Sequence, residues 1–427
     1  MLTRHKNAGK NILWLLSDHA ITFVGGLFIG IWLARSLGPA DFGLFSYALA
    51  IFAIFSSVAR VGLDGLAIRE LVQSKDIPNS ILTIGTMKAV GSFISFVLLC
   101  LFVLVDAESS NRAIFCILIG VGILLTPSTV IDNYFDSRVQ SRRKVVARKV
   151  GYIVKCILLI AFISFELPLL YLALAVLSEQ LIALVLLVNF IREEVSFTKF
   201  EFSMDRAKAL GRECWPLIVS SLGAMLYLKV DQIMIVSMIG DAEGGYYGAA
   251  VRYTSIFFFL HSIVITTYFP TLVKSKEESL QIYLQQVSKM SSGLFYLSMF
   301  VIAGTYLFIE PFLLLTYGAE YIPSIAIIKL HVWTLPLVFI GALLSKWLIL
   351  EKLTRFSIWR HGMGLLVNVV LNMILIPRYG AEGAAMASIV ALVFAVVFIL
   401  AFHEKLRLLF KVLLKSIFLP LKLSSAN

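Results

Sequence analysis

The stretch Arg35-Ser36-Leu37-Gly38-Pro39-Ala40-Asp41-Phe42-Gly43 joins two long apolar runs, and the rest of the chain is organised around it. A weaker copy, Gly240-Asp241-Ala242-Glu243-Gly244-Gly245, follows at an offset of 202 residues, close to half of the 427-residue chain. At that offset Gly38 falls on Gly240, and Gly43 falls on Gly245. We interpret the pair as the trace of an internal duplication. The alternative is that Gly-rich turns between apolar runs look alike by chance.

Composition places the chain in a membrane. Hydrophobic residues make up 59% of it and charged residues only 15%, whereas soluble domains carry about 25% charged residues. The first apolar run, residues 11–34, is too long for a removable signal peptide and has no small-residue cleavage site. The four cysteines lie in or beside apolar runs without Cys-x-x-Cys spacing, so we expect small core residues rather than disulfides or a metal site.

The hydropathy pattern predicts twelve membrane-spanning helices, because a helix needs about 20 mostly apolar residues to cross the hydrocarbon. The predicted spans are residues 12–34, 42–62, 86–105, 113–132, 147–165, 168–191, 216–239, 246–268, 291–310, 325–350, 357–376 and 381–402. Several prolines fall at run ends, where they cost little.

The distribution of Lys and Arg predicts the orientation. With the N-terminus in the cytoplasm, 29 of the 37 Lys and Arg residues fall in inner segments and only Arg35, Arg112 and Arg378 in outer connections. This asymmetry follows the positive-inside rule. The net charge of +11 is therefore mostly a consequence of topology, and no nucleic-acid partner is expected. We predict a multi-pass membrane protein with both termini cytoplasmic.

The longest inner connection divides six spans from six. We predict an N-terminal six-helix bundle at residues 1–195, a cytoplasmic linker at 196–215 with a surface helix beginning near Ser203, and a C-terminal six-helix bundle at 216–402. An even number of spans per half gives both halves the same orientation, so a pseudo-two-fold axis would run along the membrane normal. Residues 403–427 form a basic tail in which Arg407, Lys411 and Lys415 share one face. We expect an interfacial helix on the anionic leaflet, with a thirteenth span as the alternative.

No sequence pattern indicates an enzyme. The chain has no Walker A motif, no nucleophile turn and no His/Cys cluster with metal spacing, and no cofactor is expected. Ionisable residues inside the predicted spans are the candidates for function, because each is costly there. They are Asp18, His19, Lys155, Glu179, Lys229, Asp231, Arg252, His261, Lys329, His331 and Lys346.

Depth separates these residues. Lys155, Glu179 and Lys229 lie roughly a third to half of the way through their spans, where they cannot easily reach water. Asp231 and Arg252 lie at similar depths in adjacent antiparallel spans, so we predict that they form an ion pair. Lys329 and Lys346 lie near span ends, and His261 and His331 are expected to be packed, hydrogen-bonded residues. Five fixed bases against three acids predict a cationic lumen that suits an anionic cargo.

A family resemblance emerges from the order of several motifs. Arg35-x-Leu37-Gly38-Pro39-x-x-Phe42-Gly43 follows the first span, and Asp132-Asn133-Tyr134-Phe135 follows the fourth. Asp231-Gln232-Ile233-Met234 precedes Gly245-Tyr246-Tyr247-x-Ala249-Ala250-x-Arg252, and Asn368 and Asn372 precede Ile376-Pro377-x-Tyr379-Gly380-x-x-Gly383-Ala384-Ala385. With twelve predicted spans, the chain resembles the polysaccharide transporter family of the multidrug/oligosaccharidyl-lipid/polysaccharide exporter superfamily.

The resemblance implies an all-α polytopic membrane protein with the fold of the multidrug-extrusion branch, two bundles around a central cavity. It implies a flippase that moves undecaprenyl-pyrophosphate-linked oligosaccharide, such as an O-antigen repeat unit for lipopolysaccharide, across the membrane by alternating access. A counter-ion, H⁺ or Na⁺, would drive transport. Besides membrane lipids, the partner would be the lipid-linked oligosaccharide, with its polyprenyl tail remaining in lipid.

On this interpretation the charged residues take two roles. Lys155, Lys229, Arg252 and Arg35 are the predicted anion contacts, and Asp18, Asp231 and Glu179 are the candidates for ion coupling. Two other classes stay open. A multidrug antiporter of the same fold would show a resistance phenotype and an acid-rich cavity, and a membrane glycan polymerase would need a sizeable outer loop.

Overall fold

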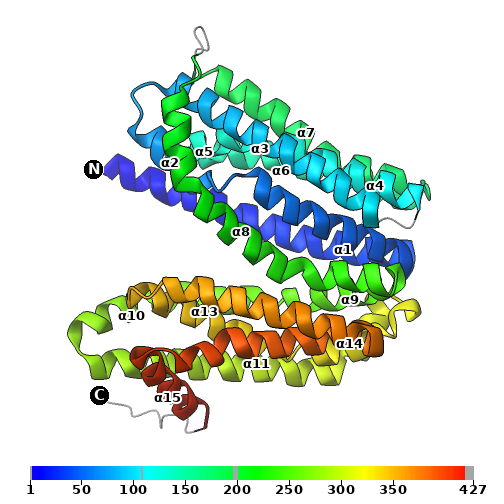
Figure 1. The fold of residues 1–427 in the computed structure, drawn as a ribbon, viewed down its shortest axis with the longest axis vertical. Coiled ribbons are helices and arrows are strands. Elements are labelled where there is room, and N and C mark those ends of the chain that lie inside the picture. The colour runs from blue at the N-terminus through cyan, green and yellow to red at the C-terminus, as the bar shows by residue number, and fades with distance from the viewer. Residues whose placement is uncertain (1, 107–108, 196–200, 419–427) are drawn as a thin grey trace. The chain divides into compact units, whose positions relative to one another are not determined.

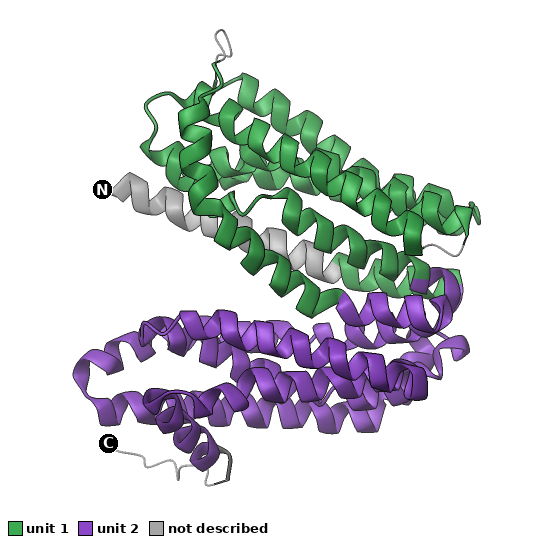
Figure 2. Ribbon diagram, in the orientation of Figure 1, with its two compact units in different colours: residues 1–37, 44–229 green, residues 38–43, 230–427 purple. Residues whose placement is uncertain are grey.

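A computed structural model describes the backbone of residues 2–106, 109–195 and 201–418, with side chains from residue 25 to residue 416 within these ranges. Helices make up nearly all of this part of the chain, and none of its residues forms a β-strand (Figure 1). The chain divides into two compact units: residues 1–37 with 44–229, and residues 38–43 with 230–427 (Figure 2).

Unit 1 contains most of the helices of the N-terminal half. They are α1 (Leu2–Ala59), α2 (Asp64–Gln73), α3 (Ile77–Asp106), α4 (Ser110–Gly120), the 3₁₀ segment η1 (Val121–Ser128), α5 (Thr129–Ser137), α6 (Ser141–Ser164), α7 (Leu169–Arg192) and most of α8 (Met204–Met238). Helices α6 and α7 pack extensively on each other. Gly151 of α6 permits this approach, because an added Cβ there would lie 2.4 Å from the carbonyl oxygen of Glu179.

Unit 2 contains the end of α8 and all helices that follow it in the chain. These are α9 (Asp241–Ser255), α10 (Phe258–Glu278), α11 (Leu280–Thr316), η2 (Ala319–Tyr321), α12 (Ser324–His331), α13 (Thr334–Leu350), α14 (Arg355–Val396), η3 (Phe398–Ala401) and α15 (Glu404–Phe418). Residues 38–43 belong to this unit because they pack on residues 241–245.

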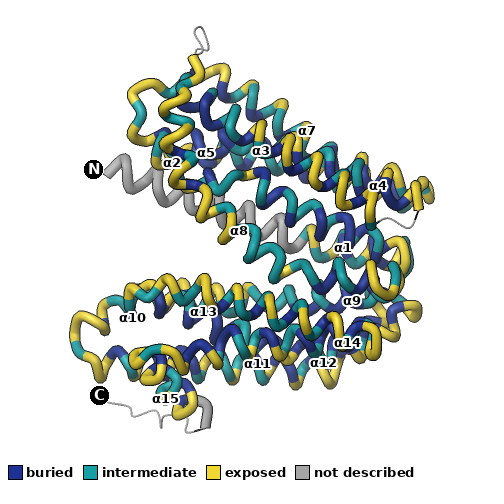
Figure 3. The backbone as a smooth tube through the Cα atoms, in the orientation of Figure 1, coloured by how far each residue is buried: buried dark blue, intermediate teal, exposed yellow. Residues whose placement is uncertain are grey.

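The described helices have the character of membrane spans. Nine helical segments in the described ranges are long and apolar enough to cross a membrane. All twelve predicted runs overlap helices, but two of the nine segments, residues 25–73 and 355–401, each hold parts of two predicted runs. The number of crossings, twelve, therefore stays a prediction. Many large apolar side chains are exposed, such as Val105 (90%) and Leu315 (78%), as expected for a surface that faces lipid. Exposed positions recur along the helices of both units (Figure 3).

Two glycines lie where one predicted span ends and the next begins. Within α1 the helix is interrupted at Gly38 (φ 72°, ψ 175°), directly before Pro39. The duplicated position, Gly240, has φ 130° and the same ψ of 175°. Side chains with a Cβ rarely adopt such positive φ angles, which explains why glycine stands at both positions. The shared backbone conformation supports the interpretation of the two stretches as copies of one unit.

The end of the predicted linker is continuous with the next predicted span. A helix begins at Met204, next to the predicted start at Ser203, and continues through Pro216 to Met238 as one element, α8. The predicted domain boundaries in this region stay predictions.

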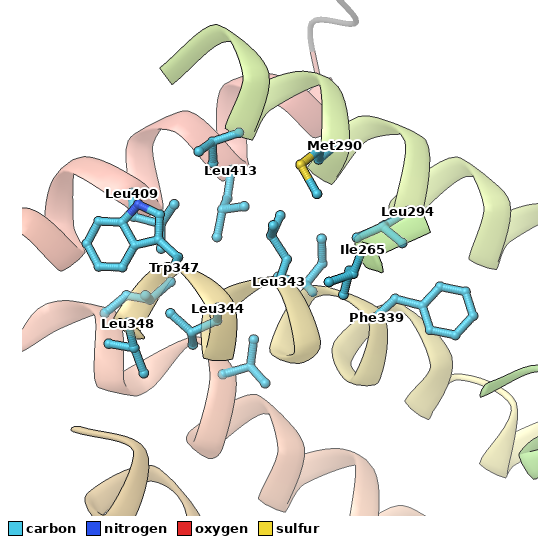
Figure 4. Packing of buried hydrophobic residues seen from close by; sticks show 14 of the residues in the cluster. Ile265, Met290, Leu294, Phe339, Leu343, Leu344, Trp347, Leu348, Leu409 and Leu413 are labelled. Atoms are coloured by element: carbon cyan, nitrogen blue, oxygen red, sulfur yellow. The ribbon is translucent and has the colours of Figure 1, made fainter. Parts of the chain in front are cut away.

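The tail helix α15 has its apolar face covered by protein. Leu406, Leu409 and Leu413 are 0%, 1% and 6% exposed, and they pack on residues of α11 and α13 such as Met290 and Trp347 (Figure 4). Arg407, Lys411 and Lys415 occupy the exposed face. These three leucines therefore belong to the hydrophobic core of unit 2, and the location of α15 on the membrane surface stays a prediction.

Candidate functional site

The carboxylate of Asp231, in α8, is the centre of a buried polar cluster in unit 2. Asn372 Nδ2 donates to Asp231 Oδ1 at 2.6 Å. The hydroxyls of Tyr247, at 2.7 Å, and Ser388 both donate to Asp231 Oδ2. Asn368 Oδ1 accepts a second hydrogen bond from Asn372 Nδ2 at 3.2 Å. Asp231 is only 8% exposed and Asn372 is fully buried, so these donors replace water around the charge.

A break in α14 creates this cluster. Asn372 and Ser388 are 16 residues apart, a distance of roughly 24 Å along a straight helix. Both nevertheless bind the same carboxylate. Gly380, with φ 58° and ψ −138°, interrupts α14 between them, and the chain turns back on itself there. Gly383 allows the return, because a Cβ at that position would lie 2.4 Å from the carbonyl oxygen of Leu375.

Two further polar residues support the cluster. The ring of His331, in α12, lies edge-on to the ring of Tyr247 with centroids 5.8 Å apart. His331 Nδ1 and the Thr254 hydroxyl are hydrogen-bonded at 2.9 Å. The prediction that His331 is a packed, hydrogen-bonded residue is confirmed. These contacts fix the Tyr247 ring so that its hydroxyl points at Asp231.

The cluster is suited to holding a proton or a small cation. Asn372 Oδ1 is buried and has no hydrogen-bond partner among the described residues, and it belongs to the residue that binds Asp231. No group of three or more His, Cys, Asp or Glu that could hold a metal ion occurs in the described part of the chain. One carboxylate surrounded by neutral hydrogen-bonding groups carries a single negative charge, which one proton or one monovalent cation would balance.

Arg252 does not pair with Asp231, and the predicted ion pair is wrong. The guanidinium of Arg252 lies over the ring of Phe42, 5.4 Å from its centroid, and its Nη1 has no hydrogen-bond partner among the described residues. Counting residues from the turn fixed the depth of the two side chains but not the direction in which each leaves its helix. Asp231 is instead satisfied by three neutral donors.

In unit 1, Lys155 and Glu179 form an ion pair, although the sequence predicted anion binding for the first and ion coupling for the second. Lys155 Nζ, in α6, forms a charge-assisted hydrogen bond with Glu179 Oε2, in α7. Lys155 also lies over the ring of Tyr152, 4.6 Å from its centroid. The pair reduces the cost of placing both residues in a span, because each offsets the other's desolvation. Each residue is therefore the partner of the other.

Further ion pairs cluster near the ends of α2, α5 and α6. Lys88, completely buried in α3, binds Asp64 Oδ1 at 2.6 Å and Thr129 Oγ1 at 2.8 Å. Lys144 binds Asp136 at 2.7 Å, and Arg148 binds Asp132. The carboxylates of these pairs line one cavity.

The other charged residues predicted from the sequence are distributed over both units. Arg35 is exposed and Lys229 is half-buried at the end of unit 1. The side chain of Asp18 lies outside the described residues. Lys329 and Lys346 lie over the rings of Tyr306 and Phe269 at 5.9 and 5.5 Å. That Arg35, Lys155, Lys229 and Arg252 share a cationic lumen stays a prediction.

Sequence reasoning missed the neutral members of the Asp231 cluster. Asn368, Asn372, Ser388 and Tyr247 were not assigned a role as site residues, although all four lie within or beside apolar runs. The available signal was an amide repeated at a four-residue spacing in a span, which places Asn368 and Asn372 on one helix face.

The helical architecture and the buried polar clusters within the spans define a multi-pass membrane protein with the fold of transporters. A structure described as lipid II flippase MurJ in an inward closed conformation matches over 95% of this chain and 91% of that one, with TM-score 0.71 and 15% identity. An inward-facing multidrug resistance MATE family transporter matches over 94% of this chain and 99% of that one, with TM-score 0.70 and 16% identity.

A third solved structure, of the MATE multidrug transporter DinF-BH, matches with TM-score 0.64 at 15% identity over 95% of this chain and 96% of that one. No curated protein matched the sequence. Residues 8–276 match the family described as polysaccharide biosynthesis protein. The chain therefore belongs to the polysaccharide biosynthesis protein family, and it has the fold shared by MurJ and the MATE transporters.

Proposed function

We propose that the protein is a flippase for undecaprenyl-pyrophosphate-linked oligosaccharide, the precursor of a surface glycan such as O-antigen. The observation that carries this proposal is the family match over residues 8–276, which links the chain to polysaccharide biosynthesis. The fold of the MurJ structure, described as a lipid II flippase, adds a precedent for flipping a lipid-linked cargo with this architecture.

The Asp231 cluster supplies the proposed coupling to an ion gradient. A buried carboxylate that reaches four helical segments, α8, α9 and both parts of α14, couples the occupancy of one ion site to the packing of these helices. A proton or Na⁺ at Asp231 would weaken or redirect the hydrogen bonds from Tyr247 and Ser388. An equilibrium between two conformations of the protein shifts only when a ligand binds one of them more tightly. The ion would bind the two helix packings with different affinity, because its binding changes the hydrogen bonds of Asp231 that join these helices.

The proposal also assigns the cargo contacts. The pyrophosphate is attracted by the cationic side chains of Lys229, Arg252 and Arg35, and the polyprenyl tail stays in lipid. Lys155 has a weaker claim than the sequence indicated, because Glu179 neutralises it in this structure. The protein acts in the cytoplasmic membrane of a bacterium with both termini inside, in agreement with the distribution of Lys and Arg.

A flipping assay in proteoliposomes tests the proposal. The purified protein is reconstituted with undecaprenyl-pyrophosphate-linked oligosaccharide, and accessibility of the sugar to an external glycosidase is followed with and without a proton or Na⁺ gradient. We expect gradient-dependent exposure of the sugar, which Asp231→Asn abolishes while the protein stays folded. The variant Ser298→Ala, in α11, is a matched control, since its hydroxyl donates to the Phe295 carbonyl within its own helix.

A multidrug antiporter is the second candidate, because a MATE transporter shares the fold over 94% of this chain. The two functions separate in cells. A flippase predicts loss of surface glycan without a change in drug resistance when the gene is deleted. Increased sensitivity to organic cations with intact surface glycan would instead support the antiporter.

A further inference from the structure

Unit 1 contains a polar cavity of about 520 Å³ that the proposed ion site and pyrophosphate contacts do not use. It is lined by α1, α2, η1, α5, α6 and α7. The lining includes four carboxylates, three basic side chains, amides, hydroxyls and the ring of Phe52. Its volume falls in the range of about 300–1,000 Å³ that is typical of small-ligand sites.

Three buried polar atoms at the cavity have no hydrogen-bond partner among the described residues. They are Ser56 Oγ, Asp132 Oδ1 and Asn133 Nδ2. Their residues line the cavity and are 9%, 9% and 6% exposed. A buried polar atom without a partner is costly, and native proteins contain few of them. Three at one cavity therefore indicate a place prepared for a ligand that completes their hydrogen bonds.

The charges at this cavity are already balanced. Asp132 binds Arg148, Asp136 binds Lys144, and Glu179 binds Lys155. Asp64 binds both Lys88 and Arg60, the latter at 3.7 Å. Every carboxylate of the lining thus has a basic partner. A site for pyrophosphate needs unpaired basic groups, and a site for an organic cation needs an unpaired carboxylate.

We infer that this cavity binds a neutral saccharide, the sugar portion of the lipid-linked cargo; this inference rests on the proposed function. Sugar hydroxyls both donate and accept hydrogen bonds. One hydroxyl donates to Asp132 Oδ1, another accepts from Asn133 Nδ2, and Ser56 Oγ takes either role. The ring of Phe52 offers an apolar surface for the carbon face of a pyranose. Unit 1 thus recognises the glycan while basic residues elsewhere attract the pyrophosphate.

Two polar deletions and one steric block test the site. Ser56→Ala and Asn133→Leu each remove an unpartnered polar group without adding much volume. Gly65, in α2, lines the cavity, and an added Cβ there would meet no heavy atom within 4 Å. Gly65→Trp therefore introduces a bulky side chain at the cavity wall, and its Cβ clashes with no neighbouring atom. Ser95→Ala is the matched control for Ser56→Ala, since Ser95 Oγ donates to the Phe55 carbonyl at 2.5 Å.

The probes are neutral monosaccharides and disaccharides, with inorganic pyrophosphate as the anionic comparison, titrated against the full-length protein in detergent by calorimetry. We expect a neutral saccharide to bind. Ser56→Ala and Asn133→Leu should weaken it roughly threefold to tenfold each, and Gly65→Trp should abolish binding. Ser95→Ala should bind like the unmodified protein. Pyrophosphate should bind equally well to all of these variants.

Thermal unfolding without ligand distinguishes a binding site from a structural role. Removing an unpartnered buried group relieves a desolvation penalty, so Ser56→Ala and Asn133→Leu should unfold at the same or a higher temperature than the unmodified protein. Ser95→Ala loses a made hydrogen bond and should unfold at a lower temperature. Lower stability of both cavity variants, with unchanged saccharide binding, would overturn the inference.

The inference and the proposed function fail in different ways. Surface glycan that depends on the gene but is displayed normally by both cavity variants, which also bind saccharide normally, refutes the saccharide cavity and leaves the flippase standing. Saccharide binding that both cavity variants weaken, in a protein whose deletion leaves surface glycan intact, keeps the saccharide site and refutes the flippase. Binding of pyrophosphate in competition with saccharide would overturn the assignment of a neutral ligand.

Discussion

Gly43 and Gly245 each lie directly against the backbone of the other's loop. A Cβ on Gly43 would be 1.7 Å from the carbonyl oxygen of Asp241, and a Cβ on Gly245 would be 1.9 Å from the carbonyl oxygen of Pro39. The offset of 202 residues maps Gly43 onto Gly245 and Pro39 onto Asp241. The two contacts are therefore copies of each other, as a pseudo-two-fold relation between the duplicated stretches requires.

Alanine at Gly43 or Gly245 should destabilise the protein. The opposing atoms belong to backbone and cannot rotate away, so we expect a cost of about 1–3 kcal/mol or more. Thermal unfolding of the purified variants measures this. Gly304→Ala, in α11, is the control, because an added Cβ there meets no atom within 4 Å and alanine favours a helix by roughly 0.5–1 kcal/mol. Equal stability of Gly245→Ala and the unmodified protein would contradict the close packing.

Asp231 and Arg252 should contribute to stability independently. Asp231→Ala leaves the donors Tyr247, Asn372 and Ser388 without their acceptor, whereas Arg252→Ala removes a guanidinium stacked on Phe42. Side chains without shared partners give effects that add within about 0.3–0.5 kcal/mol. The double variant should therefore lose the sum of the two single losses. Recovery of stability or abundance in the double variant would instead restore the ion pair.

Lys229 should be needed for transport and not for folding. A charge near mid-membrane costs at least about 2.5 kcal/mol on insertion scales, so a residue kept for packing alone would be better as Met or Leu. We expect Lys229→Ala to insert normally and to lose surface glycan, and Lys229→Arg to keep part of the activity. Immunoblots of the membrane fraction and of surface glycan measure the two properties. Full glycan display by Lys229→Ala would remove this residue from the mechanism.

The orientation predicted from Lys and Arg can be read with reporter fusions. Fusions after Asn427 and near Lys208 should report a cytoplasmic location, and a fusion near Glu320 should report the periplasm. Lys208 and Glu320 are exposed, so a reporter there disturbs little packing. A periplasmic signal at residue 427 would show that the number of spans differs from twelve or that the tail crosses the membrane.

Glu351 should make the attachment of α15 sensitive to acid. Lys276 Nζ and Lys405 Nζ each lie 2.7 Å from a Glu351 oxygen. Burial of the Glu351 carboxyl raises its pKa, but the two lysines outweigh burial and hold the pKa below the usual 4.5. A depressed pKa means that the stabilisation is present above the unfolded-state value and is lost as the pH falls through the folded-state pKa.

Acid should therefore loosen α15 in a way that Glu351→Gln removes. We expect the protection factors of residues 404–418, that is, exchange rates corrected for the intrinsic pH dependence of amide exchange, to fall as the pH drops below about 4.5. The contribution should be about 1 kcal/mol, because Lys405 is 55% exposed and screened by solvent. Glu351→Gln should show faster exchange at neutral pH and no added change in acid. An identical pH profile in both proteins would assign the acid sensitivity to other groups.

The amino-acid sequence by itself determined the class of the protein, its apolar runs and the duplicated turn. These follow from local properties: the length of the apolar runs, the low share of charged residues, and glycines that recur at Gly38 and Gly240. The residues proposed to carry ion chemistry were found in part, since Asp231 stands out as an acid in an apolar run.

Only the tertiary structure decided which residues meet. Counting along the helices predicted similar depths in the membrane for Asp231 and Arg252. The contacts of each side chain depend on the rotation of its helix about the helix axis. The partners of Asp231 depend also on the turn at Gly380, because this turn brings Ser388 to the carboxylate that Asn372 binds. The same holds for Lys155 and Glu179, whose pairing depends on the close contact of α6 and α7 at Gly151. The sequence pattern places a side chain at a depth along its helix. The packing of helices that are distant in sequence decides which other side chain it contacts.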